Sequence, residues 1–210
     1  MIGGGTMRCM SEENGWLQQL QANPEHSRWY IERFRAMAEA GADLAGEARL
    51  IDAMLPRGGR VLDAGCGTGR VGGFLAAAGH EVVGVDLDPT LIGAARQDHP
   101  GPQWLVGDLA ELDLPAQGIA DGFDVVVCAG NVMTFAAPGT RQEILRRFRR
   151  HLRAQGRAVV GFGAGRGYEF ADFLDDARAA GLVPDLLLST WDVRPFADDS
   201  DFLVASLRPQ

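Results

Sequence analysis

The stretch that decides the fold is residues 61–70, VLDAGCGTGR, in which a strand runs into a glycine turn and then into a helix. Val61 and Leu62 are continuously apolar, as in strands that are covered on both faces. Gly65 and Gly67 allow positive φ and a close approach of the backbone to a ligand, and the helix start offers free N–H donors. The third glycine of the dinucleotide pattern GxGxxG would fall at position 70, which is Arg, so that fingerprint is not met.

Strands and helices alternate on both sides of this turn. We expect strands over residues 60–64, 81–86, 103–106, 123–128, 157–162, 182–190 and 202–207, and helices over 69–78, 89–97, 141–153 and 169–179. Such alternation is typical of a parallel sheet with right-handed crossovers and helices on both faces. The sequence therefore predicts an open, doubly wound α/β fold.

The chain is expected to form one domain over residues 27–210, preceded by a flexible extension over residues 1–26. Apolar residues recur at helical spacing over 27–55 with a weak point at Gly41, which predicts two helices or one broken helix. Residues 56–208 then form the sheet-containing core. A chain of 210 residues with 46% apolar side chains can bury roughly 70% of its unfolded surface, so it is long enough for a real core.

The composition excludes several classes of function. The 28 acidic residues outweigh 20 basic ones, all of them Arg, for a net charge of −8. The absence of Lys excludes a P-loop lysine and a lysine Schiff base, and the acidic balance disfavours nucleic acid. The arginine-rich helix over 141–153 is expected to be a solvated face.

Cysteine usage and hydropathy bear on the compartment. Cys9, Cys66 and Cys128 form neither a disulfide framework nor a metal-binding pattern, which fits a reducing, cytoplasmic compartment. No stretch approaches the roughly 18 apolar residues that a membrane span requires. We expect a monomer or homodimer that binds no metal, no nucleic acid and no membrane.

Three acidic residues stand where neighbouring strands end. Asp63 suits a ligand that brings a positive charge, Asp86 can accept both hydroxyls of a ribose, and Asp108 can accept a hydrogen bond from an adenine amino group. Each of them could instead cap a turn or a helix, as Asp commonly does. NAD and adenosyl compounds both suit a ribose acid, whereas the set of three describes S-adenosylmethionine.

Residues 63–69, DAGCGTG, together with the strand-end Asp86 and the pair Gly107-Asp108, resemble the sequential motifs of class I S-adenosylmethionine-dependent methyltransferases. The resemblance covers residues 56–208, and within the family the chain is similar to the small, cap-less, tellurite-resistance-type members. It implies a Rossmann-like class I methyltransferase fold: a seven-stranded, mostly parallel sheet with an antiparallel last strand and helices on both faces. It also implies S-adenosyl-L-methionine as the cofactor.

The resemblance further implies which residues border the cofactor. The fourth motif corresponds to residues 123–133, FDVVVCAGNVM, which lack the Asn/Asp-Pro-Pro-Tyr/Phe signature of amino-methylating DNA and protein enzymes. Cys66 is expected to be a small buried filler rather than a nucleophile. The residues expected at the cofactor are Asp63, Gly65, Cys66, Gly67, Asp86, Leu87, Asp108, Leu109, Ala129, Gly130 and Asn131, with Tyr30 and Arg33 from the N-terminal helix.

The loop after the fifth strand, residues 163–170, is expected to face the methyl acceptor. Arg166 can pair with an anionic substrate, and Tyr168 can position or deprotonate a hydroxyl, although a flexible loop and a packed tyrosine would look the same. Tyr168 and Asp192 are the candidate general bases, and Trp191 and Arg194 form a second candidate wall.

The expected function is direct, in-line transfer of a methyl group from S-adenosylmethionine to a small-molecule acceptor, with the protein mainly positioning the reactants. Two alternatives stay open at this point. A nicotinamide-dependent oxidoreductase would share the glycine turn and the ribose acid. A non-catalytic adenosyl-ligand-binding module would explain why no catalytic base is evident.

Overall fold

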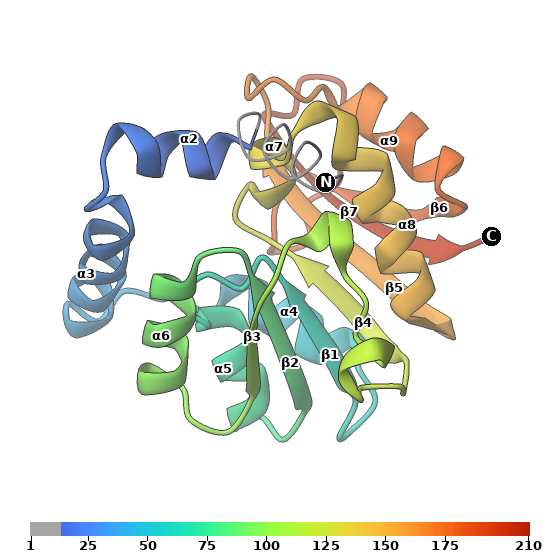
Figure 1. The fold of residues 1–210 in the computed structure, drawn as a ribbon. Helices are drawn as coiled ribbons and strands as arrows, with labels where there is room; N and C mark the ends of the chain where they lie inside the picture. Colours follow the sequence, from blue (N-terminus) through green and yellow to red (C-terminus); the bar gives the residue numbers. More distant parts are fainter. Residues whose placement is uncertain (1–13) are drawn as a thin grey trace, which may run out of the picture.

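A computed structural model describes residues 14–210 of the chain, which are built around a seven-stranded sheet of order β3-β2-β1-β4-β5-β7-β6 (Figure 1). The pairs of β1 with β2 and β4, of β2 with β3 and of β4 with β5 are parallel, and β7 runs antiparallel to both β5 and β6. The strands are β1 (Arg60–Ala64), β2 (Glu81–Asp86), β3 (Gln103–Val106), β4 (Phe123–Cys128), β5 (Leu152–Gly163), β6 (Leu182–Leu188) and β7 (Phe202–Pro209).

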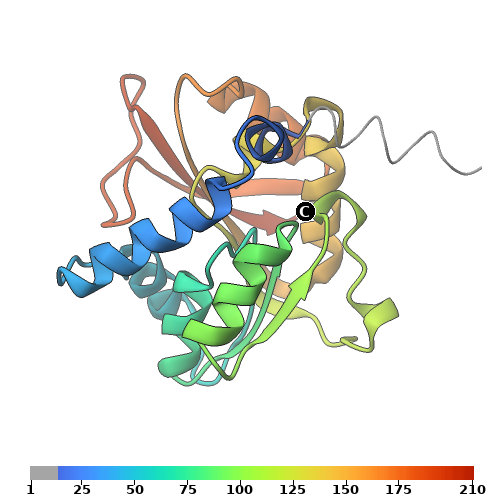
Figure 2. The same cartoon turned by 60° about the vertical axis from the view of Figure 1, so that its left-hand side comes forward.

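Helices cover both faces of this sheet, and α3 lies beside α6 (Figure 2). The α-helices are α2 (Gly15–Ala22), α3 (His26–Glu39), α4 (Gly46–Met54), α5 (Arg70–Ala77), α6 (Pro89–Asp98), α7 (Val132–Phe135), α8 (Arg141–His151) and α9 (Phe170–Ala179), and the short 3₁₀ helices are η1 (Leu109–Glu111), η2 (Pro115–Gln117) and η3 (Pro138–Thr140).

The alternation of side chains along each strand divides the core into two layers. Val61 and Val125 pack with residues of α4 and α5 on one face of the sheet. Leu62 and Val126, their chain neighbours, pack with residues of α8 and α9 on the other face. Because both faces are covered, the central strands are apolar throughout, which is the pattern from which the sequence predicts them.

Trp104 of β3 fills the space between β2, α5 and α6, and it does so where three glycines leave room. A Cβ atom at Gly84 would lie 2.2 Å from the Trp104 ring, and those at Gly72 and Gly69 would lie 2.8 and 2.9 Å away. The indole N–H donates to the carbonyl of His99 at 2.9 Å. Part of the high glycine content is therefore explained by this one large side chain.

The predicted α/β fold and sheet are confirmed, and the break at Gly41, which has φ of +75°, separates α3 from α4. The predicted flexible extension is wrong from Gly15 onward, because α2 is a capped and packed helix. The Asn14 side chain accepts from the N–H groups of Trp16 and Leu17, and Trp16 is only 8% exposed. Residues 1–13 lie outside the described part of the chain.

Candidate active site

A pocket opens at the carboxyl ends of the parallel strands, between β1 and β4. At this point the order in which successive strands are added to the sheet changes from one side to the other. The pocket lining is mostly apolar, with carboxylates at two points. The lining residues are Asn14, Trp16, Tyr30, Gly65, Asp86, Leu87, Leu91, Gly107, Asp108, Leu109, Gly130, Val132, Phe135, Ala136 and Ile144.

Asp86 ends β2 and lines this pocket. Its Oδ2 accepts the N–H of Gly67 at 2.8 Å, and its Oδ1 accepts the N–H of Asp88 at 2.9 Å. Burial raises the pKa of this carboxyl, and the two N–H donors act in the opposite direction by stabilising the charged form. Two donors leave part of the carboxylate's acceptor capacity free, so Asp86 can still accept hydroxyl groups from the pocket.

Asp108 follows β3 and lines the same pocket from the other side of Leu87. One oxygen accepts the Ala110 N–H at 2.8 Å and so caps the 3₁₀ turn η1. The free oxygen remains available to a donor in the pocket. The expected capping role and the expected ligand role of Asp108 are therefore compatible with each other.

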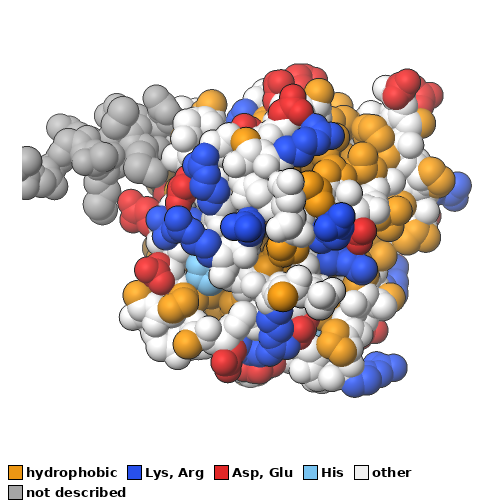
Figure 3. Space-filling view, turned by 90° about the vertical axis from the view of Figure 1, so that its right-hand side faces the viewer, with side chains coloured by type: hydrophobic (Ala, Val, Ile, Leu, Met, Phe, Trp, Pro, Cys, Tyr) orange, Lys and Arg blue, Asp and Glu red, His pale blue; other side chains and the backbone are white. Residues whose placement is uncertain are grey.

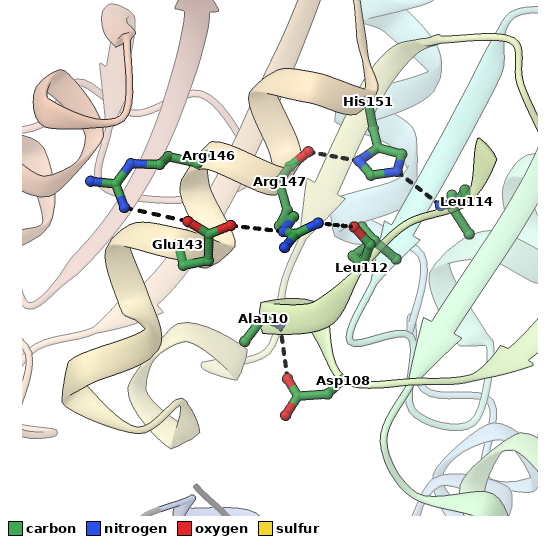
Figure 4. A network of polar contacts seen from close by, with 8 residues as sticks. All are labelled: Asp108, Ala110, Leu112, Leu114, Glu143, Arg146, Arg147 and His151. Atoms are coloured by element: carbon green, nitrogen blue, oxygen red, sulfur yellow. Dashed lines mark hydrogen bonds and ion pairs between the residues drawn. The ribbon is translucent and has the colours of Figure 1, made fainter. Parts of the chain in front are cut away.

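Contacts from α8 hold the segment that carries Asp108 in place (Figure 4). The Arg147 guanidinium donates to the Leu112 carbonyl at 3.2 Å, and its Nε donates to Glu143 at 2.8 Å. The Leu114 N–H donates to His151 Nε2 at 3.1 Å, so Nδ1 carries the proton and donates to the Arg147 carbonyl at 2.7 Å. His151 and Arg147 thus act on the position of the pocket wall rather than on a ligand.

Asp63 does not line the pocket, contrary to the expectation that it receives the positive charge of a ligand. It is 2% exposed, and its Oδ2 accepts the N–H of Gly72 at 2.8 Å beneath the glycine turn. Burial raises the pKa of this carboxyl to about 7. Asp63 therefore fastens the turn to the start of α5.

Arg70, which stands where the pattern GxGxxG has its third glycine, also has a structural role. Arg70 forms a two-pronged ion pair with Glu47 of α4, at 2.6 and 2.8 Å, and also donates to the Leu44 carbonyl. Its guanidinium lies 5.6 Å from the centre of the Phe34 ring in α3. Arg70 therefore connects the glycine turn to helices α3 and α4.

Two glycines with positive φ, Gly65 and Gly130, line the pocket, and Val132 packs closely on the first of them. Gly65 has φ of +77°, and a Cβ there would lie 2.5 Å from the Val132 side chain. Gly130 has φ of +75°, and a Cβ there would meet nothing within 4 Å. Gly67 does not line the pocket but faces Tyr30. Ala129 packs in the core layer that includes residues of α4 and α5. The backbone can thus be approached closely at Gly130.

Helices α2 and α3 cover the pocket, and the sequence analysis missed most of this cover. Trp16 of α2 lines the pocket, and its Nε1 donates to Asp88 Oδ2 at 3.0 Å. Ser27 of α3 donates its hydroxyl to the same oxygen. Asp88 also caps α6 through Thr90 and Leu91. The motif DxD at residues 86–88 is visible in the sequence. Nothing in the sequence indicates that Asp88, its second acid, binds helices α2 and α3.

Of the two residues expected from the N-terminal helix, Tyr30 lines the pocket and Arg33 does not. Tyr30 contacts the Trp16 ring edge to face, with the ring centres 5.6 Å apart. The Arg33 guanidinium lies over the ring of Trp29, which is on the outer side of α3. Burial raises the pKa of the Tyr30 hydroxyl, so this residue stays neutral.

Cys66 is a buried filler, as expected, packed against Ile92, Ala95 and Trp104. Burial raises its pKa well above the ordinary value of a thiol. A neutral, buried thiol is a poor nucleophile. In residues 14–210, nowhere do three His, Cys, Asp or Glu side chains gather as a metal site would need.

The structure argues against Tyr168 as a general base or a substrate contact. Tyr168 is 3% exposed, stacks on Phe162, and donates its hydroxyl to Asp176 at 2.7 Å. Burial and the neighbouring carboxylate of Asp176 raise its pKa far above the ordinary value of tyrosine. The Arg141 guanidinium covers the other side of its ring, 4.1 Å from the centre. Tyr168 is therefore a packed core residue, which was the alternative to a role in the reaction.

Asp192 is equally unsuited to the role of a base. Its side chain is 69% exposed, lies 3.6 Å from Arg194, and does not line the pocket. Trp191 lies across β5, so close to Gly161 that a Cβ there would be 2.4 Å from its ring. Arg166 is exposed on the loop after β5. Of the four expected acceptor contacts, Tyr168 is buried and Trp191 packs on β5, whereas Arg166 and Arg194 are exposed and stay predictions.

The donors and acceptors of the pocket fit S-adenosylmethionine. Asp86 can hold the ribose hydroxyls and Asp108 the adenine amino group, while Leu87, Leu109 and Ile144 offer apolar contact to a flat base. The backbone at Gly130, where a Cβ would meet nothing within 4 Å, is open to the methionine portion. The residues present therefore fit this cofactor without any addition from outside the described chain.

Comparison with known proteins agrees with this geometry. Residues 61–156 match the family model described as "Methyltransferase domain". A TehB-like SAM-dependent methyltransferase from Corynebacterium glutamicum ATCC 13032 is 51% identical with a TM-score of 0.84, over 90% of this chain and 100% of that chain. The CcbJ methyltransferase from Streptomyces caelestis, at 20% identity and a TM-score of 0.70 over 80% of this chain and 95% of that one, shares the fold.

Two curated relatives match over shorter stretches. The putative methyltransferase YqeM of Bacillus subtilis is 29% identical over 142 residues, which are 65% of this chain and 54% of YqeM. Magnesium-protoporphyrin O-methyltransferase of Rhodobacter capsulatus is 41% identical over 86 residues, 39% of this chain and 36% of that protein. The chain thus spans about half the length, or less, of these relatives. Because it is 51% identical to the Corynebacterium protein over the full length of that protein, the chain belongs to the class I S-adenosylmethionine-dependent methyltransferases, enzymes that use S-adenosyl-L-methionine as cofactor.

Proposed function

We propose that this chain transfers the methyl group of S-adenosylmethionine directly to a small-molecule acceptor. The observation that carries the proposal is the placement of Asp86 and Asp108 on one mostly apolar pocket at the switch point of the sheet. The cover over this pocket is the reason for proposing an acceptor of small size. Helices α2 and α3 place Trp16 and Tyr30 against it, which leaves little room for a folded protein or a nucleic acid at the methyl group.

The chain's own residues have three tasks in this reaction. Asp86 and Asp108 orient the cofactor by its ribose and adenine, and the aromatic cover of Trp16, Tyr30 and Phe135 excludes water. When bound, S-adenosylmethionine supplies a methyl group that is already activated by the positive sulfonium. Holding the acceptor in line with it supplies about 7–11 kcal/mol of barrier reduction.

No general base is needed in this proposal. Asp86 is held by two N–H donors, Asp108 caps a turn, and Tyr30 stays neutral, so none of the ionisable lining residues is poised to remove a proton. The proposed acceptor therefore carries its nucleophilic atom in a form that needs no deprotonation by the enzyme, such as a free lone pair on nitrogen or a thiolate.

Calorimetric titration with S-adenosylmethionine and S-adenosylhomocysteine tests the cofactor site. Replacing Asp86 by Ala removes the acceptor for two ribose hydroxyls, and hydrogen bonds to charged groups contribute about 1.5–3 kcal/mol each. We expect the Kd of D86A to rise at least about 10-fold. The matched control is D175A, because Asp175 is an exposed acid on α9 whose partner is Arg178.

The reaction itself is tested by release of S-adenosylhomocysteine in the presence of a panel of small acceptors. Release with any of them supports the proposal. Binding of the cofactor without release from the complete panel supports a non-catalytic adenosyl-binding module instead. A change in NADH fluorescence on addition of the protein, without binding of either adenosyl compound, would point to the oxidoreductase alternative.

A further inference from the structure

Within residues 14–210, Arg166 has no ion-pair partner, and it lies on a loop near the pocket. It lies on the loop that follows β5, between Gly165 and Gly167, whose φ values are +69° and +73°. In the described part of the chain most arginines have an ion pair or a hydrogen bond, which is expected where acids outnumber bases. Arg166 has neither, and its side chain is exposed. Its charge is therefore available to a ligand.

Asn131 lies next to this arginine and is held in an unusual conformation. Its φ is +67°, a region that residues other than glycine seldom adopt and that is frequent at functional sites. Its Oδ1 accepts the N–H of Gly163 at 2.8 Å, which fixes the orientation of the amide. The Nδ2 amino group is therefore the end that is free to donate to a ligand.

One glycine brings the two side chains together. A Cβ atom at Gly163 would lie 3.4 Å from Arg166 Nε, 3.7 Å from Asn131 Oδ1 and 3.7 Å from the Asp201 carbonyl oxygen, which already accepts the Ala164 N–H, so both side chains border the space beside Gly163 at the end of β5. This space adjoins the cofactor pocket, because Gly130 and Val132, the chain neighbours of Asn131, both line that pocket. A group held here lies beside the part of the pocket where the backbone is open.

We propose that Arg166 and Asn131 form a recognition site for an anionic group, a carboxylate or a phosphate, on the methyl acceptor. This inference rests on the proposed function, which it extends to a class of acceptor. The planar guanidinium donates two parallel hydrogen bonds to such an oxyanion, and the Asn131 amino group adds a third donor. An acceptor held by its anionic end can present its nucleophilic atom toward the pocket.

The test uses ¹⁵N NMR of the arginine Nε–H groups in the full chain saturated with S-adenosylhomocysteine. Benzoate and phenyl phosphate are titrated as probes, and neutral benzamide serves as their control. We expect a saturable shift of the Arg166 signal, assigned by its loss in R166Q, with at least one anion and not with benzamide. Arg150, assigned by R150Q, is the matched control, because it is exposed on α8 and has no ion pair with any residue that the structure describes.

The variant N131D separates recognition from folding. Its carboxylate retains an acceptor for the Gly163 N–H but replaces the free amino group by a repelling oxygen. We expect N131D to unfold at a similar temperature and to weaken anion binding at least about 10-fold, as loss of a charge-assisted hydrogen bond implies. N131G, which suits the positive φ, should weaken binding less because it adds no negative charge.

The proposal is overturned if the Arg166 signal does not shift, if it shifts no more than that of Arg150, or if benzamide shifts it equally. Comparison of the two anions decides between a carboxylate and a phosphate. If S-adenosylhomocysteine binds and the anions do not, the proposed function stands and this inference fails. If S-adenosylhomocysteine does not bind, the proposed function fails, and the same titrations on the free protein still decide the anion site.

Discussion

Asp63 lies beneath the glycine turn and does not line the pocket. Its position directly before the glycine turn led us to expect a contact with a positively charged ligand. The carboxyl is instead enclosed under the turn, where Gly72 donates to it. A sequence identifies an acid at the end of a strand, but the direction of its side chain depends on the packing of α5, which the local sequence does not specify.

This burial predicts a stability that depends on pH. The unfolded chain loses the Asp63 proton near pH 4, whereas the folded protein holds it up to a pKa of about 7. Between these values the folded state binds more protons, so the free energy of unfolding falls as the pH rises, by at most about 1.4 kcal/mol per pH unit. The loss is complete above pH 7.

Thermal unfolding of the wild type and of D63N between pH 4.5 and 8.5 measures this effect. D63N keeps an acceptor for the Gly72 N–H but cannot ionise. Its free energy of unfolding should therefore lack the pH-dependent contribution of the Asp63 carboxyl. We expect the wild type to lose stability relative to D63N as the pH rises toward 8. Parallel curves for the two proteins would contradict the enclosed, proton-holding carboxyl.

The glycines around Trp104 give a second prediction at the scale of one residue. An added methyl group at Gly84 would meet the ring at 2.2 Å, so G84A should destabilise the protein by about 1–3 kcal/mol or more. Gly93 is the control, since it is exposed in α6 and a Cβ there meets nothing within 4 Å. G93A should stabilise by about 0.5–1 kcal/mol. Urea denaturation measures both, and equal midpoints would contradict the packing described.

At the scale of elements, the cover formed by α2 and α3 depends on one carboxylate. Asp88 Oδ2 accepts from Trp16 of α2 and from Ser27 of α3, while Oδ1 caps α6. Since the N–H of Asp88 also donates to Asp86, the fastening of the cover and the ribose acid belong to one connected network. We therefore expect that opening of the cover would disturb Asp86 as well.

This network predicts that W16F and S27A release S-adenosylhomocysteine faster than the wild type. W16F keeps a ring over the pocket but loses the donor to Asp88. Removal of a hydrogen bond to a charged group costs about 1.5–3 kcal/mol, so the dissociation rate should rise about 10-fold or more in displacement experiments. W29F is the control, because Trp29 is 51% exposed. Equal rates for W16F and W29F would rule out the fastening role.

The elements also show where prediction from sequence ends. Strands β1, β2 and β4 are apolar on both faces, so their composition identifies them regardless of context. Helix α2 has eight residues and α7 has four, too short to be stable in isolation. They form because Trp16 packs against Phe135 and Tyr30, contacts between segments far apart in the chain. Local pattern does not contain that information.

For the whole molecule, one face with several arginines can be compared with the sequence-based expectation. Figure 3 looks onto the side of the molecule where α8 and α9 lie and shows basic side chains with acids between them. On α8, Glu143 bonds both Arg146 and Arg147, while Arg149 and Arg150 are exposed. This arrangement fits the expected solvated helix face. In the described residues, every helix is too short or too polar to span a bilayer.

The sheet and the two acids of the pocket could be predicted because their signals are local in the chain. The acceptor side could not, since Tyr168 is chemically suitable but is buried against Asp176, and Asp192 is exposed and does not line the pocket. Only the three-dimensional surroundings of these two groups reveal this.

The reversed direction of β7 has one consequence for how such an enzyme can diversify. Because β6 runs in the same direction as β5, its carboxyl end, with the connection over residues 189–201, lies at the same edge of the sheet as the loop over 163–169. Neither segment contains a helix that links parallel strands. Both can therefore be lengthened or grafted from another chain while the half of the sheet that carries β1, β2 and β3 is left intact.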